Sequence, residues 1–223
     1  MIKKAIIFDF DGVIVDSEPA RLNTYVQLFQ QQFNREIRFD PKALIGKSEK
    51  ENIRTLLLQN DIVISDQAFT ELIRLRSSLL NEIALTELTL IKASEFILSN
   101  LNHRHIDLAI VSNSTQPYIT RILQYFRLDR LFRTIISIEQ VKNGKPHPDS
   151  YRLAMNHLNI QPNHCLAIED SPTGIRAANA AGITCLGLTT SFDQSVLAEA
   201  KTCFAATNND CAVWINSWMS DGD

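Results

Sequence analysis

The chain has 223 residues, of which 45% are hydrophobic and 21% are charged, and its formal net charge is −3. These values are typical of a globular protein with a sizeable core, and the absence of a basic run argues against nucleic-acid binding. No apolar stretch reaches the ~18 residues of a membrane span, and the first strand begins too early for a signal peptide, so we expect a cytoplasmic monomer without a membrane partner.

The first apolar run predicts a strand that ends in acidic residues. Residues 5–8, AIIF, are typical of a strand buried on both faces, and Asp9, Asp11 and Gly12 follow. Alternate residues of a strand share a face, so both carboxylates could point the same way. Two such charges repel by ~4 kcal/mol at 4 Å and an effective dielectric constant of 20. One interpretation is that the fold uses the two carboxylates to bind a cation, to share a proton or to supply a nucleophile. The alternative is a polar strand end with solvated aspartates.

Residues 17–87 have the periodicity of helices alone. Apolar residues recur at helical spacing from Ala20 to Phe33, after the capping-box pair Ser48 and Glu51, and after Asp66, which is placed to cap its helix. The stripes indicate a small helical bundle in which the apolar residues form the core. We predict that 17–87 is a separate helical unit, inserted into a domain formed by residues 1–16 and 88–223.

Strands and helices alternate along the rest of the chain. Strands are predicted at 106–111, 134–138, 165–168, 184–188 and 203–205, with helices between them. The helix after the strand 165–168 has Ser171 as its cap, Pro172 in its first turn and Gly182 beyond its end. This alternation predicts an α/β fold with a doubly wound parallel sheet.

Polar residues follow four of the predicted strands, at the edge where ligands bind in such sheets. They are Asp9 and Asp11, Ser112 and Asn113, Lys145, and Glu169 and Asp170. Acidic oxygens suit Mg²⁺, and an aspartate nucleophile can form an aspartyl-phosphate. A hydroxyl and an ammonium can hold the oxygens of a phosphoryl group, while a second carboxylate exchanges protons. Each residue alone has an ordinary structural explanation, but their combination favours phosphoryl transfer.

Four segments, DFDGVIVDSEP, VSNS, GKPHPD and EDSPTGIRAANAAG, resemble the four motifs of the haloacid dehalogenase-like superfamily. The similarity is to the branch that contains β-phosphoglucomutase and small-molecule phosphatases, and it spans nearly the whole chain. It implies that residues 1–16 and 88–223 are a Rossmann-like catalytic core, that residues 17–87 are a helical cap domain, and that Mg²⁺ is the cofactor. The roles that it implies are Asp9 as nucleophile, Asp11 as general acid and base, Ser112, Asn113 and Lys145 as phosphate ligands, and Asp9, Asp11, Glu169 and Asp170 around the metal.

The resemblance also places substrate selectivity in the cap, where the candidates are Glu18, Arg21, Lys47 and Ser48. The function that it implies is a Mg²⁺-dependent phosphatase that hydrolyses a small phosphorylated metabolite, a sugar or polyol phosphate, through an aspartyl-phosphate. A phosphohexomutase of the β-phosphoglucomutase type is the main alternative, because it would share every core residue. A non-catalytic member and a receiver-like signalling module are further alternatives, although receivers are about half this length and have no cap.

The cap favours hydrolysis over isomerisation. The mutases have a histidine after the first motif, and a lysine and an arginine around a cap Gly-x-Ser. The matching positions here are Arg21, Ile45 and Glu49. An arginine does not relay protons at neutral pH as a histidine does, and the cap has lost two cations that could hold a second phosphate. We therefore predict a phosphatase.

Overall fold

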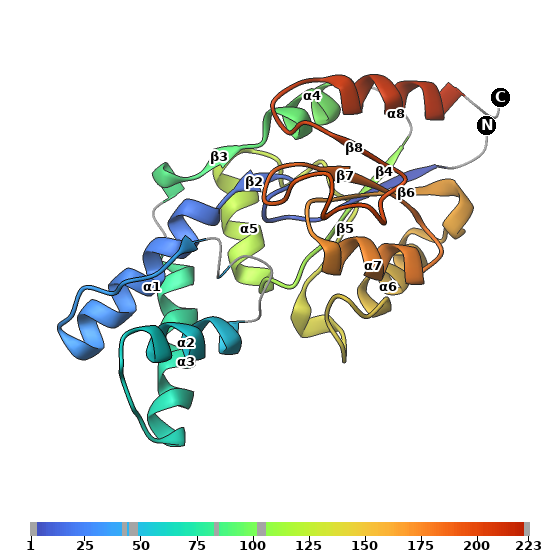
Figure 1. The fold of residues 1–223 in the computed structure, drawn as a ribbon. Helices are drawn as coiled ribbons and strands as arrows, with labels where there is room; N and C mark the ends of the chain where they lie inside the picture. The colour runs from blue at the N-terminus through green and yellow to red at the C-terminus, as the bar shows by residue number, and fades with distance from the viewer. Residues whose placement is uncertain (1–3, 42–43, 45–48, 83–84, 102–105, 221–223) are drawn as a thin grey trace. The chain divides into compact units, whose positions relative to one another are not determined.

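The computed structural model describes residues 4–41, 44, 49–82, 85–101 and 106–220 (Figure 1). They divide into two compact units, Met1–Asp16 with Thr89–Asp223, and Ser17–Leu88. The chain leaves the first unit through β2 (Val15–Asp16) and returns through β3 (Thr89–Leu90), which pair antiparallel with Asp16 opposite Thr89. Within the described residues, no helix combines the length and apolar character that crossing a membrane requires.

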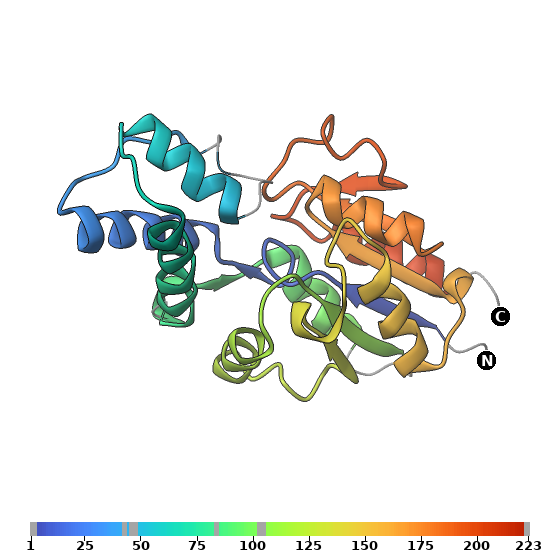
Figure 2. The same cartoon turned by 90° about the horizontal axis from the view of Figure 1, so that it is seen from below.

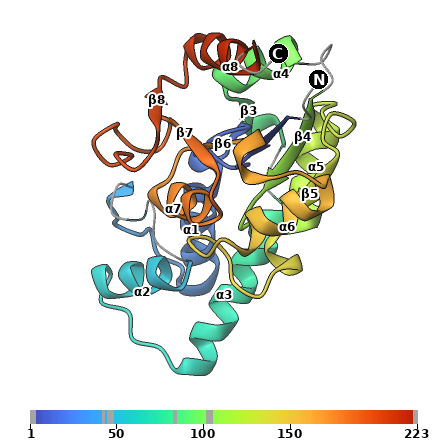
Figure 3. The ribbon, with the colours of Figure 1, turned by 90° about the vertical axis from the view of Figure 1, so that its right-hand side faces the viewer.

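A six-stranded sheet forms the centre of the first unit (Figure 3). Its strands are β1 (Ala5–Phe8), β4 (Asp107–Val111), β5 (Thr134–Ile136), β6 (Cys165–Glu169), β7 (Thr184–Leu188) and β8 (Thr202–Phe204). Their order is β5-β4-β1-β6-β7-β8, and every neighbouring pair is parallel. The predicted doubly wound parallel sheet is confirmed.

The strand predicted at 134–138 is shorter than expected. β5 ends at Ile136, and a 3-10 helix, η3 (Ile138–Gln140), follows it. Ser137 and Gln140 form a capping box there: the Gln140 side chain accepts a hydrogen bond from the Ser137 backbone N–H, and the Ser137 side chain accepts one from the Gln140 backbone N–H. Satisfying these donors locally stabilises a turn in place of further strand.

Helices cover both faces of the sheet. They are α4 (Lys92–Leu101), α5 (Gln116–Tyr125), α6 (Asp149–Leu158), α7 (Pro172–Ala180), α8 (Asp210–Ser220) and the short η4 (Pro162–His164). α6 and α7 lie side by side on one face, and α4 packs against α8 on the other (Figures 1 and 2). This arrangement leaves the carboxyl ends of the strands as the edge at which side chains from several strands can meet.

The local sequence explains the close packing of α7. The helix begins as predicted, with Ser171 accepting a hydrogen bond from the Gly174 N–H at 3.1 Å and with Pro172 as its first residue. Gly182 follows the helix end with φ +81°, a conformation that glycine adopts without strain. Ala177 and Ala178 are fully buried, and such small side chains let the helix lie directly on the sheet.

The second unit is helical, as its periodicity predicted. It contains α1 (Glu18–Phe33), α2 (Glu49–Gln59), α3 (Asp66–Asn81) and the 3-10 helix η2 (Leu85–Glu87). One cluster of buried apolar residues forms its core: Tyr25, Leu28, Phe29, Leu44, Ile53, Leu56, Leu57 and Leu72. The predicted cap of α3 is wrong: Ser65 caps the helix by accepting from the Ala68 N–H at 3.2 Å, and Asp66 is the first helical residue. An acidic first turn still suits the positive end of the helix dipole.

Candidate active site

The candidate site lies where β1, β4 and β6 end. β1 is paired with β4 on one side and with β6 on the other, so the strand order extends from β1 in two opposite directions. Asp9 directly follows β1, Ser112 follows β4, and Glu169 and Asp170 stand at the end of β6. A switch in strand order of this kind is the usual ligand-binding position of an open parallel sheet.

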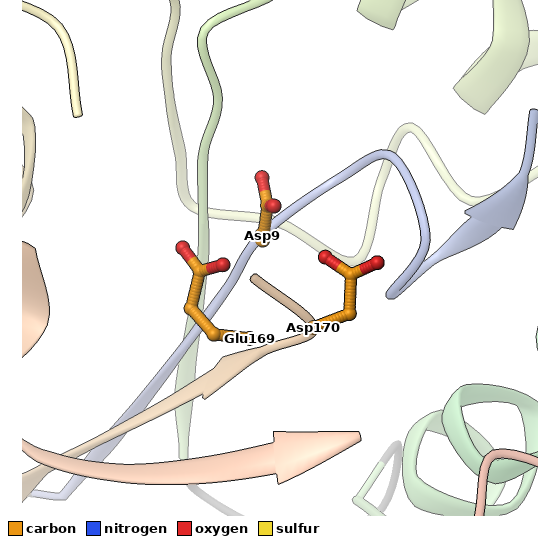
Figure 4. A group of neighbouring side chains, drawn as sticks. All are labelled: Asp9, Glu169 and Asp170. Atoms are coloured by element: carbon orange, nitrogen blue, oxygen red, sulfur yellow. The ribbon is translucent and has the colours of Figure 1, made fainter. Parts of the chain in front are cut away.

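Three buried carboxylates meet at this position. Asp9, Glu169 and Asp170 each have an oxygen within 4.8 Å of the others', and Figure 4 shows the three side chains at the ends of β1 and β6. None of the three residues is more than 7% exposed. Water therefore screens their mutual repulsion poorly, and the site requires positive charge.

Lys145 supplies part of that charge. Its Nζ lies 2.6 Å from Asp9 Oδ1 and 2.8 Å from Glu169 Oε1, and it donates to the Val111 carbonyl at 3.3 Å. Burial alone would lower the pKa of Lys145, but these two carboxylates raise it above its ordinary value, so the side chain remains an ammonium. Three carboxylates and one ammonium leave a formal charge of about −2 in a buried site.

The pKa values of the carboxylates reflect the same excess of negative over positive charge. Burial and the nearby Glu169 raise the pKa of Asp9 well above its ordinary value, although Lys145 lowers it. Burial also raises the pKa of Asp170 to about 7, with a further increase from Glu169, against the lowering effect of its hydrogen bond from Ser191. A buried set of oxygen donors with a surplus charge of about −2 fits a divalent cation such as Mg²⁺.

Neighbouring hydroxyl groups hold two of these carboxylates in place. Glu169 accepts from the Tyr151 hydroxyl at 2.7 Å and from the Ser171 hydroxyl at 3.3 Å, and Asp170 accepts from the Ser191 hydroxyl. Sequence reasoning assigned Ser171 only to helix capping and did not select Tyr151 or Ser191. Ser191 follows the end of β7, so the rule that polar residues gather at strand ends could have found it.

Gly174 allows α7 to begin directly against Glu169. A Cβ at this position would lie 1.9 Å from the Glu169 carboxyl carbon. We expect Gly174→Ala to displace Glu169, to lower kcat, and to destabilise the protein by about 1–3 kcal/mol, as overpacking of a filled core does. Urea unfolding and phosphate-release kinetics measure the two effects. Gly182→Ala is the matched control, because its Cβ comes no closer than 3.5 Å to Pro162: it strains a positive φ but leaves the site alone.

Asp11 lies apart from the acidic cluster and has different partners. Its Oδ2 accepts from the Ser114 hydroxyl at 2.6 Å, and its Oδ1 accepts from the Tyr118 hydroxyl at 3.0 Å. The chain turns after it at Gly12, where φ is +79° and a Cβ would lie 2.0 Å from Asp170 Oδ2. The two aspartates at the end of β1 therefore meet different chemistry, an ammonium at Asp9 and hydroxyl groups at Asp11.

The segment after β4 connects these parts. Ser112 is buried, and its Oγ accepts from the Ser114 N–H at 3.0 Å. The exposed Asn113 side chain accepts from the Lys145 N–H at 3.0 Å and donates to the Lys145 carbonyl at 3.2 Å. Asn113 thus holds the loop that carries Lys145 through two hydrogen bonds. The contact with phosphate predicted for Asn113 stays a prediction.

The selectivity residues predicted in the cap belong to the second unit. Glu18 and Arg21 lie in the first two turns of α1, whereas Lys47 and Ser48, like Ile45, lie outside the described residues. Glu49 begins α2 and lies 3.5 Å from the buried Arg76. The roles of these residues toward a substrate stay predictions.

Residues 6–188 match the family described as haloacid dehalogenase-like hydrolase. The chain belongs to this family. The resemblance inferred from the four motifs is confirmed. The roles that these motifs imply for the strand-end residues are therefore specific hypotheses about this hydrolase.

Two relatives of this hydrolase have curated functions. Validoxylamine A 7'-phosphate phosphatase of Streptomyces hygroscopicus subsp. limoneus is 28% identical over 200 residues, which cover 88% of this chain and 91% of the relative. The phosphorylated carbohydrates phosphatase of Thermotoga maritima is 30% identical over 185 residues, which cover 81% of this chain and 82% of the relative.

A solved structure with a similar fold is the crystal structure of CbbY from Rhodobacter sphaeroides in complex with phosphate. It is 22% identical in sequence, has a TM-score of 0.79, and the match covers 93% of this chain and 96% of that chain. That likeness shows the fold alone.

Proposed function

We propose that this hydrolase is a Mg²⁺-dependent phosphatase that acts on a small phosphorylated metabolite, a sugar or polyol phosphate. The observation that carries the proposal is the contrast between Asp9, held by Lys145 beside two buried carboxylates, and Asp11, held by hydroxyl groups two residues later. Two carboxylates in different environments suit two different roles in one reaction. The names of both curated relatives, which are phosphatases of phosphorylated carbohydrates and of validoxylamine A 7'-phosphate, support the same function.

In the first step, a carboxylate oxygen of Asp9 attacks the phosphorus atom as the bond from phosphorus to the leaving oxygen breaks. Asp11 gives its proton to that oxygen, so the product leaves as an alcohol. Lys145 lies 2.6 Å from Asp9 and can stabilise the oxygens of the phosphoryl group, with Ser112 as a further donor. The product of this step is an aspartyl-phosphate at Asp9.

In the second step, water attacks the phosphorus atom of the aspartyl-phosphate. Asp11, now a carboxylate, takes a proton from the water, and the bond between phosphorus and Asp9 breaks. Inorganic phosphate leaves, and both aspartates return to their starting states. Asp9, Glu169 and Asp170 would hold the cation, with the Asp11 carbonyl as a proposed further ligand. Bound there, Mg²⁺ would supply positive charge next to the phosphoryl oxygens.

Phosphate release from a panel of sugar, polyol and short-acid phosphates, with and without Mg²⁺, tests this function. We expect Mg²⁺-dependent turnover that is fastest with sugar or polyol phosphates. A protein that took up one equivalent of phosphate without turning over would instead act as a phosphate-accepting signalling module.

We expect hydrolysis of β-glucose 1-phosphate to proceed without isomerisation. The cap position that carries an arginine in the mutases is Glu49, whose carboxylate is paired with Arg76 inside its own unit. An anion here cannot hold the second phosphate of a bisphosphate intermediate. The measurement follows glucose 6-phosphate and inorganic phosphate together, with Mg²⁺ and a trace of the bisphosphate present. Glucose 6-phosphate forming faster than phosphate would show that the protein is a mutase.

A further inference from the structure

Two hydroxyl groups contact the carboxyl group of Asp11, one at each oxygen. Ser114 Oγ lies 2.6 Å from Oδ2, and Tyr118 Oη lies 3.0 Å from Oδ1. Tyr118 is only 3% exposed, and a buried phenolic hydroxyl needs a hydrogen-bond acceptor, which Asp11 provides. Neither residue has a role in the steps described above.

Both hydroxyl groups are carried by a well-held segment. Ser114 follows β4, and its backbone N–H donates to Ser112 Oγ at 3.0 Å. Tyr118 lies in the first turn of α5, and its ring packs edge-on against Phe10 at 6.1 Å between centroids. Phe10 is fully buried and stands between the two aspartates of the first motif. The contacts therefore join Asp11 to fixed parts of the core.

The chemistry of a hydroxyl group matters for this position. A lysine only donates hydrogen bonds, so Lys145 favours the charged form of Asp9, which suits a nucleophile. A hydroxyl group can donate to a carboxylate and can also accept from a carboxylic acid. It can hold Asp11 in either protonation state, and a general acid that becomes a general base passes through both in each turnover.

We propose that Tyr118 and Ser114 are positioning residues that orient the carboxyl group of Asp11 during proton transfer. The inference rests on the proposed function, in which Asp11 gives a proton to the leaving oxygen and takes one from water. The competing explanation is that Asp11 merely satisfies a buried phenol. The two explanations differ in which substrates a variant affects.

Tyr118→Phe removes one oxygen atom and keeps the buried ring. We expect it to lower kcat/KM roughly 10-fold for an alkyl phosphate such as glycerol 1-phosphate, whose leaving oxygen needs a proton. For p-nitrophenyl phosphate, whose leaving group departs as a stable anion, kcat/KM should change less than about twofold. Ser114→Ala should give the same pattern. Tyr125→Phe, at the half-exposed end of the same helix, is the matched control and should leave kcat/KM unchanged for both substrates.

A double-mutant cycle separates positioning from a structural effect. In the Asp11→Asn background, adding Tyr118→Phe should cause no further loss with the alkyl phosphate, because the group that it orients has gone. Equal losses with both substrates, or the full single-variant loss in the Asp11→Asn background, would overturn the inference. Failure of the proposed function looks different: Asp11→Asn itself would then leave alkyl phosphate hydrolysis intact.

Discussion

Asp9→Asn is expected to lower kcat for phosphate release by at least about 10⁴-fold, since loss of a nucleophile removes the reaction path itself. The amide keeps nearly the same shape and can still accept hydrogen bonds from the Phe10 N–H and from Lys145, which lie 2.6 Å from Oδ1. It cannot form an acyl phosphate. The loss would therefore come from chemistry and not from a changed fold.

Steady-state kinetics with the preferred substrate measure this loss, and thermal unfolding verifies that the variant is folded. Asp129→Asn is the matched control, because Asp129 is exposed in the loop after α5 and should leave kcat unchanged. A second readout is the covalent state: mass spectrometry after rapid acid quench should find a phosphate adduct on the wild-type chain and none on Asp9→Asn. Near wild-type turnover by the variant would place the nucleophile elsewhere.

The sheet and the meeting of polar side chains at its strand ends could be predicted from the sequence. β1 and β6 are continuous apolar runs, and such runs separated by helical periodicity admit few arrangements other than a parallel sheet. Once all of the strands are parallel, their carboxyl ends share one edge of the sheet. The proximity of Asp9 and Glu169 therefore follows from topology before any distance is known, whereas Lys145 comes from the loop after η3.

Two of the residues that sequence reasoning missed are tyrosines, whose side chain combines an apolar ring with a polar hydroxyl group. Tyr151 is fully buried in the core under the sheet, and its spacing along α6 matches that of its apolar neighbours. Tyr118 has the same pattern in α5. Their rings account for their place in the periodicity, while the hydroxyl partners lie in other elements, Glu169 at the end of β6 and Asp11 in the turn after β1. Periodicity along one helix contains no information about such partners.

Arg76 shows the same limit in the second unit. It is 3% exposed, although arginine is among the residues least expected in a core. Its guanidinium lies 3.7 Å from the Tyr25 ring centroid and 3.5 Å from Glu49. These partners belong to α1 and α2, so only the packing of three helices makes the burial of this charge possible.

Removal of divalent cations is the other change with a very large expected effect, and it should abolish phosphate release. The surplus negative charge of the site, carried by Asp9, Glu169 and Asp170 against Lys145, has no other described counter-charge within it. A chelator should stop turnover, and added Mg²⁺ should restore it. Ca²⁺, which favours longer bonds and more ligands, should restore less.

Cation binding should also be visible as stability, independently of activity. At 100 times its Kd, Mg²⁺ stabilises the folded state by ~2.7 kcal/mol, which corresponds to a rise in Tm of about 5–10 °C for a protein of this size. Asp170→Asn should remove most of this rise, and Asp129→Asn should keep it. Two results would contradict a cation at this site. One is turnover at the full rate in the presence of the chelator, and the other is a Tm that does not change with Mg²⁺ in the wild type or in either variant.

The pH dependence of that rise has a definite sign. Without a cation, burial raises the pKa of Asp170 to about 7 from its ordinary value of 3.8. A raised pKa means that the folded state binds the proton more tightly, so this contribution to stability is fully present below about pH 3.8 and is lost as the pH rises through about 7. Mg²⁺ requires the carboxylate and therefore competes with the proton. The Tm of the chelated protein should fall between about pH 5.5 and pH 8, whereas the increase in Tm caused by Mg²⁺ should grow over the same interval, and differential scanning fluorimetry at several pH values measures both trends.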